Sequence, residues 1–319
     1  MTVAVFLEHH AWELSKGSLG VLGKAASLGD DVVGVVLGPG LQELGNQAGK
    51  FGASKVFVGN ATELEFPLPQ PRVDALAQLV QEQGIDTVLF AASVLASDVA
   101  AGLAARLDAG LNWDLVDIEP RDGSLVGKRP ALEDTVYVDV GWTSDVKLAL
   151  FRPGTYDPVE SGGEAQVEEF TPSFEDFSTQ ATMLEQAHED SEGPSIEDAD
   201  VIVAGGRGLG GPENFSLVEG LAKALGGAVA ATRAVVDAGW YPYPTQVGQT
   251  GKTVSPKLYV ACGISGAIQH KVGMQGSGTV VAINKDPNAP IFEFSDLGVV
   301  GDLHEIVPKL TELVQQRKN

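Results

Sequence analysis

The sequence predicts an α/β protein of two domains, an N-terminal doubly wound α/β domain with antiparallel additions and a C-terminal domain with a parallel sheet. Short β-branched runs alternate with Ala-, Leu- and Gly-rich segments of helical length, which is typical of parallel sheets covered by helices. A chain of 319 residues is also long for one hydrophobic core. Residues 153–206 contain no Lys or Arg and include an acidic, turn-rich stretch at 185–194. We therefore expect domains at 1–193 and 194–319.

The N-terminal domain is expected to begin with an alternation of strands and helices. Apolar runs of strand length are separated by segments in which apolar residues recur at helical spacing. The third helical segment opens at Pro71 and closes at Gly84, which are ordinary start and stop residues for a helix. The predicted strands are 2–7, 31–37, 55–58 and 86–91, and the predicted helices are 16–29, 41–52 and 71–84.

After Asn112 the pattern changes. Strand-like runs at 135–140, 147–151 and 166–170 are separated by turn residues instead of helices. We expect these three runs to be antiparallel additions to the domain. A second alternation then forms the C-terminal domain. Its predicted strands are 199–204, 228–231, 258–261 and 279–283, and its predicted helices are 213–225 and 303–315.

Composition and charge limit the classes of function. The chain is 44% hydrophobic and has no apolar run near 20 residues, so we expect a soluble globular protein. Its first residues form no export signal, and a reducing cytoplasm is the expected compartment. Residues 1–195 carry 11 basic and 31 acidic residues, whereas 196–319 carry 10 and 12. Such an acidic N-terminal part argues against nucleic acid or an anionic membrane as a partner. The acidic residues either keep the protein soluble or guide its association with a basic partner protein.

A glycine-rich turn follows the first predicted strand of the C-terminal domain. It contains a Gly-x-Gly-x-x-Gly match at Gly206, Gly208 and Gly211, placed between a strand and a helix as in Rossmann-like dinucleotide-binding domains. Arg207 stands inside the turn with no carboxylate nearby in sequence, where a guanidinium suits a pyrophosphate or adenylate group. The alternative is that the glycines serve only the packing of the strand against the helix.

Two more polar, glycine-rich turns, at 246–251 and 263–270, flank the strand at 258–261. A strand that opens into Gly and Ser and then a helix is suited to anions, because the first N–H groups of a helix have no internal partner. The next strand ends at Asn284, at the carboxyl edge where open α/β sheets bind ligands. The strand at 228–231 ends in Thr232 and Arg233, which alone indicate a helix N-cap followed by a solvated cation.

Metal and hydrolase chemistry are not expected. The five histidines form no His-x-His or His-Glu-x-x-His pair, and a lone histidine such as His270 is usually structural. The single cysteine, Cys262, excludes a disulfide framework or a cluster held by this chain alone and is expected to be a small buried residue. The sequence also lacks Gly-x-Ser-x-Gly.

Three strings of the C-terminal domain closely resemble the FAD domain of the electron transfer flavoprotein alpha subunit, the large subunit that is also called FixB. They are VGQTG at 247–251, GISGAIQH at 263–270 and AINKDPNAPIF at 282–292. The N-terminal domain resembles the same family more loosely. The resemblance implies an FAD-binding, Rossmann-like C-terminal domain.

The resemblance also implies a set of FAD contacts. It places Arg207 on FAD, Arg233 against the flavin ring and His270 at the pyrimidine edge of the ring, where positive charge or donors would favour the negative charge of the reduced flavin. Thr250 would lie near flavin N5, and Asn284 with the Asp302–Leu303 pair would hold the adenosine part. The complete predicted set is Arg207, Thr232, Arg233, Val247, Gly248, Gln249, Thr250, Ser265, Gly266, Ala267, Ile268, Gln269, His270, Asn284, Asp302 and Leu303.

By the same resemblance, the protein is an electron carrier without a small-molecule substrate of its own. It would accept electrons from flavin dehydrogenases, such as the acyl-CoA dehydrogenases of fatty acid beta-oxidation, and pass them toward a membrane quinone reductase. We expect a heterodimer with a smaller beta subunit, with the aromatic loop at 240–244 as an interface element. A flavin-bifurcating type stays open, because its extra flavin would sit in the other subunit.

Two other functions stay open at this point. The first is an NAD-dependent dehydrogenase that uses the Gly206 fingerprint, although no acidic residue lies at a strand end about 20 positions further on to take a ribose. The second is a non-redox nucleotide-binding module.

Overall fold

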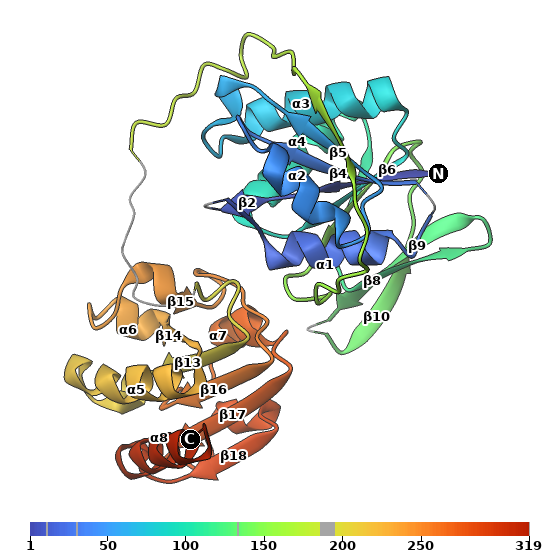
Figure 1. Ribbon diagram of the computed structural model, residues 1–319. Coiled ribbons are helices and arrows are strands. Elements are labelled where there is room, and N and C mark those ends of the chain that lie inside the picture. The colour runs from blue at the N-terminus through green and yellow to red at the C-terminus, as the bar shows by residue number, and fades with distance from the viewer. Residues whose placement is uncertain (11, 30, 133, 186–194, 319) are drawn as a thin grey trace. The chain divides into compact units, whose positions relative to one another are not determined.

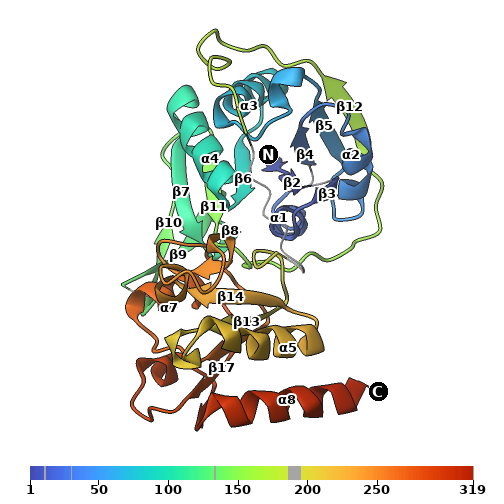
Figure 2. The ribbon, with the colours of Figure 1, turned by 90° about the vertical axis from the view of Figure 1, so that its left-hand side faces the viewer.

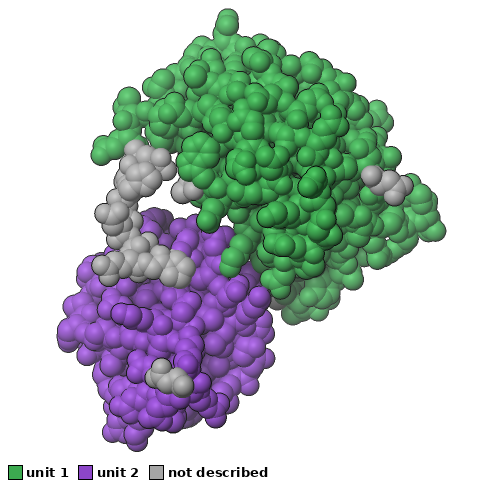
Figure 3. Space-filling view, viewed as in Figure 1, with its two compact units in different colours: residues 1–186 green, residues 187–319 purple. Residues whose placement is uncertain are grey.

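The computed structural model describes residues 1–10, 12–29, 31–132, 134–185 and 195–318 (Figure 1). The chain divides into two compact units, Met1–Gln186 and Ala187–Asn319, which Figure 3 colours separately. The boundary predicted at 193/194 lies outside the described residues, as does the acidic stretch from 186 to 194. We describe each unit by itself.

The N-terminal unit is built on a seven-stranded sheet in the order β12-β5-β4-β1-β6-β11-β7. All neighbouring strands in it run parallel, and the chain winds from β1 to both sides, as predicted for a doubly wound layer. Its strands are β1 (Thr2–Phe6), β4 (Asp31–Leu37), β5 (Lys55–Gly59), β6 (Thr87–Ala91), β7 (Gly110–Leu115), β11 (Lys147–Phe151) and β12 (Gln166–Phe170), and its helices are α1 (Lys16–Ala25), α2 (Gln42–Gly49), α3 (Pro69–Gln83) and α4 (Val94–Leu107), with a short 3₁₀ turn at Thr62–Leu64.

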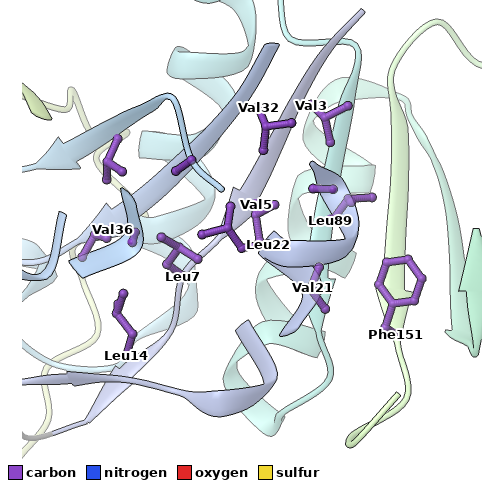
Figure 4. Close-up of a cluster of buried hydrophobic side chains, with 14 of the residues drawn as sticks. Val3, Val5, Leu7, Leu14, Val21, Leu22, Val32, Val36, Leu89 and Phe151 are labelled. Atoms are coloured by element: carbon purple, nitrogen blue, oxygen red, sulfur yellow. The ribbon is translucent and has the colours of Figure 1, made fainter. Parts of the chain in front are cut away.

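The central strand β1 is buried on both faces of this sheet. Val3 and Val5 belong to one apolar cluster, together with Leu22 of α1 (Figure 4). Ala4 and Phe6 belong to a second cluster, which contains residues of α3 and α4. Successive side chains of a strand point to opposite faces, so a strand that is apolar at every position needs helices on both sides.

The predicted direction of two strands is wrong. β11 is hydrogen-bonded in parallel to β6 and to β7, and β12 is parallel to β5 at the far edge of the sheet. The connection between them passes the end of α2, where an added Cβ at Gly49 would lie 2.3 Å from the backbone nitrogen of Ala165. The turn-rich segment between β11 and β12, all of which is described, is therefore a crossover between parallel strands that contains no helix, and its composition led to the wrong prediction of antiparallel strands.

The remaining run, at 135–140, is antiparallel, as predicted. It forms β10 (Val136–Val140) in a separate sheet with β9 (Ser124–Ala131) and β8 (Asp117–Arg121). The sequence prediction did not include α4, β7, β8 or β9. It also missed the small hairpin of β2 (His9–His10) and β3 (Glu13–Leu14).

The C-terminal unit contains a six-stranded parallel sheet in the order β15-β14-β13-β16-β17-β18. The four predicted strands are present, and the short β15 and the edge strand β18 were not predicted. The strands are β13 (Val201–Gly205), β14 (Ala228–Thr232), β15 (Gln246–Val247), β16 (Leu258–Cys262), β17 (Thr279–Asn284) and β18 (Leu297–Val300), and the helices are α5 (Phe215–Leu225), α6 (Arg233–Val236), α7 (Ile268–Met274) and α8 (Leu303–Lys318). Short 3₁₀ turns lie at Arg207–Leu209, Pro212–Asn214, Tyr243–Thr245 and Pro290–Phe294.

Two apolar clusters cover the faces of this second sheet. Val203 packs with Leu221 of α5 and Val307 of α8, and these two helices lie side by side (Figure 2). Ile202 lies in the other cluster, with Met274 of α7. The alternation along β13 therefore gives one face to α5 and α8 and the other to α7. Within the described ranges, no helix is long and apolar enough to cross a bilayer.

Candidate cofactor-binding site

The carboxyl edge of the C-terminal sheet gathers most of the predicted site residues. β13 is the first strand of this sheet along the sequence, and β14 pairs with it on one side and β16 on the other. Loops that leave neighbouring strands in opposite directions leave a crevice between them, which is the usual ligand site of an open parallel sheet. The glycine turns after β13 and β16 both lie at this point of reversal.

The glycines of these two turns serve close backbone packing. The N–H group of Gly208 donates to the carbonyl of Gly263 at 2.9 Å, and an added Cβ at Gly208 would lie 2.6 Å from Gly263 Cα. The N–H group of Gly206 likewise donates to the carbonyl of Cys262 at 2.9 Å. These two N–H groups are therefore used within the protein. α5 also begins only at Phe215, after two 3₁₀ turns, so the fingerprint glycines do not open a helix as dinucleotide-binding turns do.

Polar side chains without protein partners remain at the same edge. Arg207 and Ser265 are exposed and Thr232 is half-buried, and none of the three side chains has a hydrogen-bond or ion-pair partner in the described part of the chain. Thr232 precedes α6 but its hydroxyl caps no N–H group, contrary to the N-cap alternative. Arg233 is exposed and pairs with Asp237 at 3.2 Å, a contact that contributes little in water. A guanidinium and two hydroxyls are thus available to a ligand.

The turn at 247–251, which we call the VGQTG loop, lies backbone to backbone on α7. The N–H group of Gln249 donates to the carbonyl of Gln269 at 2.7 Å. Gly248 has φ +139°, and an added Cβ there would lie 2.8 Å from the same Gln269 carbonyl. Thr250 is exposed, and its hydroxyl and carbonyl oxygens accept from the Gln246 amide at 3.2 and 2.9 Å. The predicted residues of the VGQTG loop and of 267–270 therefore pack directly against one another.

The side chain of His270 is 7% exposed and lies beneath the VGQTG loop. Its Nε2 is 3.0 Å from the hydroxyl of Tyr259, and its Nδ1 is 3.1 Å from the carbonyl oxygen of Val247. Burial lowers the pKa of the His270 imidazole to about 4, against a smaller opposite effect of the Val247 carbonyl. The side chain is therefore neutral near pH 7 and has partners at both ring nitrogens within the chain, so it does not supply the positive charge that was one of the two expectations for the flavin edge.

The last predicted residues join the loops that follow β16, β17 and β18. The Asn284 amide donates to the carbonyl of Ile264 at 2.8 Å, and Leu303 is buried. Asp302 accepts from the backbone N–H of His304 at 2.9 Å and lies 2.8 Å from its Nδ1. The pKa of Asp302 is lowered first by the backbone N–H group of His304 and then by its side chain.

Sequence reasoning missed two residues of this region. Tyr259 was part of an apolar strand, and only its phenol opposite His270 shows a polar role. His304 was counted only for metal binding, yet its Nε2 lies 3.2 Å from the carbonyl of Leu209 and so ties the Arg207 turn to the start of α8. Neither carries a local pattern, because each partner is distant along the chain.

Family models and relatives agree with this geometry. A model described as the electron transfer flavoprotein domain matches residues 3–175, and one described as the electron transfer flavoprotein FAD-binding domain matches 195–275. The electron transfer flavoprotein subunit alpha of Mycobacterium leprae (strain TN) is 42% identical over 317 residues, covering 98% of both chains. That of Mycobacterium tuberculosis (strain CDC 1551 / Oshkosh) is 43% identical over 319 residues, covering 99% of both, and that of Bacillus subtilis (strain 168) is 36% identical over 296 residues, covering 92% of this chain and 90% of the relative.

The chain belongs to the electron transfer flavoprotein alpha subunit family.

Membership of this family confirms the predicted cofactor, FAD, and the two-domain α/β architecture. The residues present at the carboxyl edge fit FAD. A pyrophosphate needs positive charge and donors, which the unpaired Arg207, Thr232 and Ser265 offer. Among the described residues there is no group of three or more His, Cys, Asp or Glu side chains placed to hold a metal ion. Cys262 is buried, and burial raises the pKa of its thiol to about 12, so it is a packing residue as predicted.

Proposed function

We propose that this electron transfer flavoprotein alpha subunit carries electrons from flavin dehydrogenases, such as acyl-CoA dehydrogenases, to a membrane quinone reductase. It is a redox carrier without a small-molecule substrate of its own. FAD supplies the redox chemistry when bound, and the chain binds and orients it. The domain that does so is taken to be 194–319, joined to an N-terminal domain of residues 1–193, and the protein acts in the cytoplasm.

The observation that carries the proposal is the set of unpaired polar groups at the point of reversal of the C-terminal sheet. Arg207 would hold the phosphates or the adenylate, while Thr232 and Arg233, one strand away, would meet the flavin. The VGQTG loop and residues 265–270 would line the ring, and Asn284 with Asp302 and Leu303 would hold the adenosine part. Because Gly206 and Gly208 have used their N–H groups on the neighbouring turn, the charged side chain of Arg207 is the group of this turn that we assign to an anion.

A beta subunit completes this carrier in our proposal. The relatives are named as alpha subunits, which implies a second chain. The alpha chain also has exposed aromatic and apolar side chains beside the site, at Tyr243 and Ile268 (65% and 47% exposed). Such side chains suit a surface that another chain covers.

The test is reconstitution of the co-expressed pair. Visible absorption of the purified complex should show flavin, and an acyl-CoA dehydrogenase reduced by its substrate should bleach it, with reoxidation on addition of a quinone reductase and quinone. A complex that is colourless and gains no flavin would contradict FAD binding. Reduction by NADH alone, with no response to the dehydrogenase, would favour the dinucleotide dehydrogenase instead.

A further inference from the structure

Three residues of the C-terminal unit form a buried hydrogen-bonded chain beneath the VGQTG loop. Tyr259, on β16, is 0% exposed, and its hydroxyl is 3.0 Å from His270 Nε2. His270 Nδ1 is 3.1 Å from the carbonyl oxygen of Val247, at the start of the loop. The chain thus runs from the sheet, through α7, to the loop.

The chemistry of the three groups defines where the hydrogens lie. A carbonyl oxygen only accepts, so His270 Nδ1 carries the hydrogen that Val247 receives. His270 Nε2 then accepts from the Tyr259 hydroxyl. Each polar atom of the Tyr259 hydroxyl, the His270 ring and the Val247 carbonyl therefore has a hydrogen-bond partner. A charged imidazole would carry a second hydrogen on Nε2 and turn the phenol into an acceptor, leaving its own hydrogen unpaired in an apolar surrounding. The burial that lowers the pKa of His270 to about 4 favours the same neutral form.

The VGQTG loop starts from the edge strand β15, whose Gln246 and Val247 pair with β14, and the Tyr259–His270–Val247 contacts give it a second link, to β16 in the middle of the sheet. A backbone contact also joins the loop to α7, where the Gln249 N–H group donates to the Gln269 carbonyl (2.7 Å), and Val254, which follows the loop, donates its N–H group to the Gly273 carbonyl (2.8 Å). The His270 ring is anchored at both nitrogens, and with one anchor removed it can turn about its χ2 torsion and withdraw its hydrogen bond from the Val247 carbonyl.

We propose that Tyr259 is a positioning residue which, by holding the ring of His270 in its neutral, Nδ1-protonated form, fixes the VGQTG loop in the conformation that receives the flavin. The role in flavin binding rests on the proposed function. The role in holding the loop does not rest on the proposed function, because it concerns only contacts within this polypeptide.

The experiment compares Tyr259→Phe with Tyr241→Phe in the full-length chain. Both changes remove one phenolic hydroxyl from the same domain, and Tyr241 donates at 3.2 Å to Glu219, away from the loop. Hydrogen–deuterium exchange of the flavin-free protein is measured on peptides that cover 246–254 and on peptides of β13 and α5. Tyr259→Phe should speed exchange of 246–254 by about tenfold, because a buried acceptor is left unpaired, and leave β13 and α5 unchanged. Tyr241→Phe should leave 246–254 unchanged.

Either of two exchange results would overturn the proposal. One is parental exchange at 246–254 in Tyr259→Phe. The other is an equal rise over the whole domain, which would mean that the hydroxyl serves general stability. A second measurement covers the case in which Tyr259→Phe fails to fold: nitrogen-15 NMR of the histidines in the parent chain, with His270 assigned from His270→Gln. A neutral ring with the hydrogen on Nδ1 at pH 7 supports the proposal, and a hydrogen on Nε2 or a charged ring refutes it.

Flavin retention is then measured on the complex with the beta subunit. Faster FAD release from the Tyr259→Phe complex than from the parent complex supports the link to the flavin, and equal release refutes it. If the parent complex binds no FAD, the proposed function fails while the exchange and NMR results still decide whether Tyr259 holds the loop.

Discussion

Acidification should destabilise the C-terminal unit through His270. The pKa of this histidine is lowered from 6.5 to about 4 in the folded protein, because burial disfavours the charged ring. Between these two values the unfolded chain binds a proton that the folded protein does not, so the free energy of unfolding falls as the pH falls. The contribution is fully present above about pH 7 and is lost progressively toward pH 4. A difference of this size corresponds to about 3 kcal/mol, as an order of magnitude.

The assay is hydrogen exchange of the buried β16 peptide, 258–262, at pH 7.5 and at pH 4.5, with rates corrected for the intrinsic pH dependence of exchange. This peptide reports the opening of the C-terminal unit alone. His270→Gln removes the titrating ring, so its opening free energy should fall less than that of the parent, by most of the 3 kcal/mol estimated above. His10→Gln is the control, because it removes an exposed histidine of the N-terminal unit, keeps His270, and should show the parental fall at 258–262. Equal falls in the parent and in His270→Gln would refute the reasoning.

Three further predictions concern the carboxyl edge of the sheet. Arg207→Ala should raise FAD release about tenfold or more, by loss of charge-assisted contacts, without unfolding the N-terminal unit, and equal flavin content after dialysis would count against it. Arg233→Ala should lower the first reduction potential of the bound flavin in a redox titration, because it removes the charge expected at the ring, and an unchanged potential would exclude that role. Gly208→Ala should lower the stability of the C-terminal unit by about 1–3 kcal/mol in urea unfolding, since its Cβ would meet Gly263 Cα at 2.6 Å, whereas Gly220→Ala, where nothing lies within 4 Å, should not destabilise it.

The sequence alone was sufficient for the features that depend on neighbours along the chain. The alternation of apolar runs and helical segments predicted most strands of both parallel sheets, because burial on both faces leaves a local pattern. Likewise Pro71 and Gly84 predicted the limits of α3 to within two residues, since helix ends are set by local backbone preferences. The three strings of the C-terminal domain predicted the family and FAD, both of which the comparisons confirm.

Tertiary structure decided what depends on residues far apart. β11 and β12 read as antiparallel from their turns and are parallel, because their direction is set by the strands they meet, not by the residues between them. The charge of His270 likewise could not be predicted from the sequence. It is neutral because folding removes it from water between Tyr259 and Val247, which lie 11 and 23 positions away along the chain. Strand direction and proton position both follow from non-local contacts, and only the folded chain brings those contacts together.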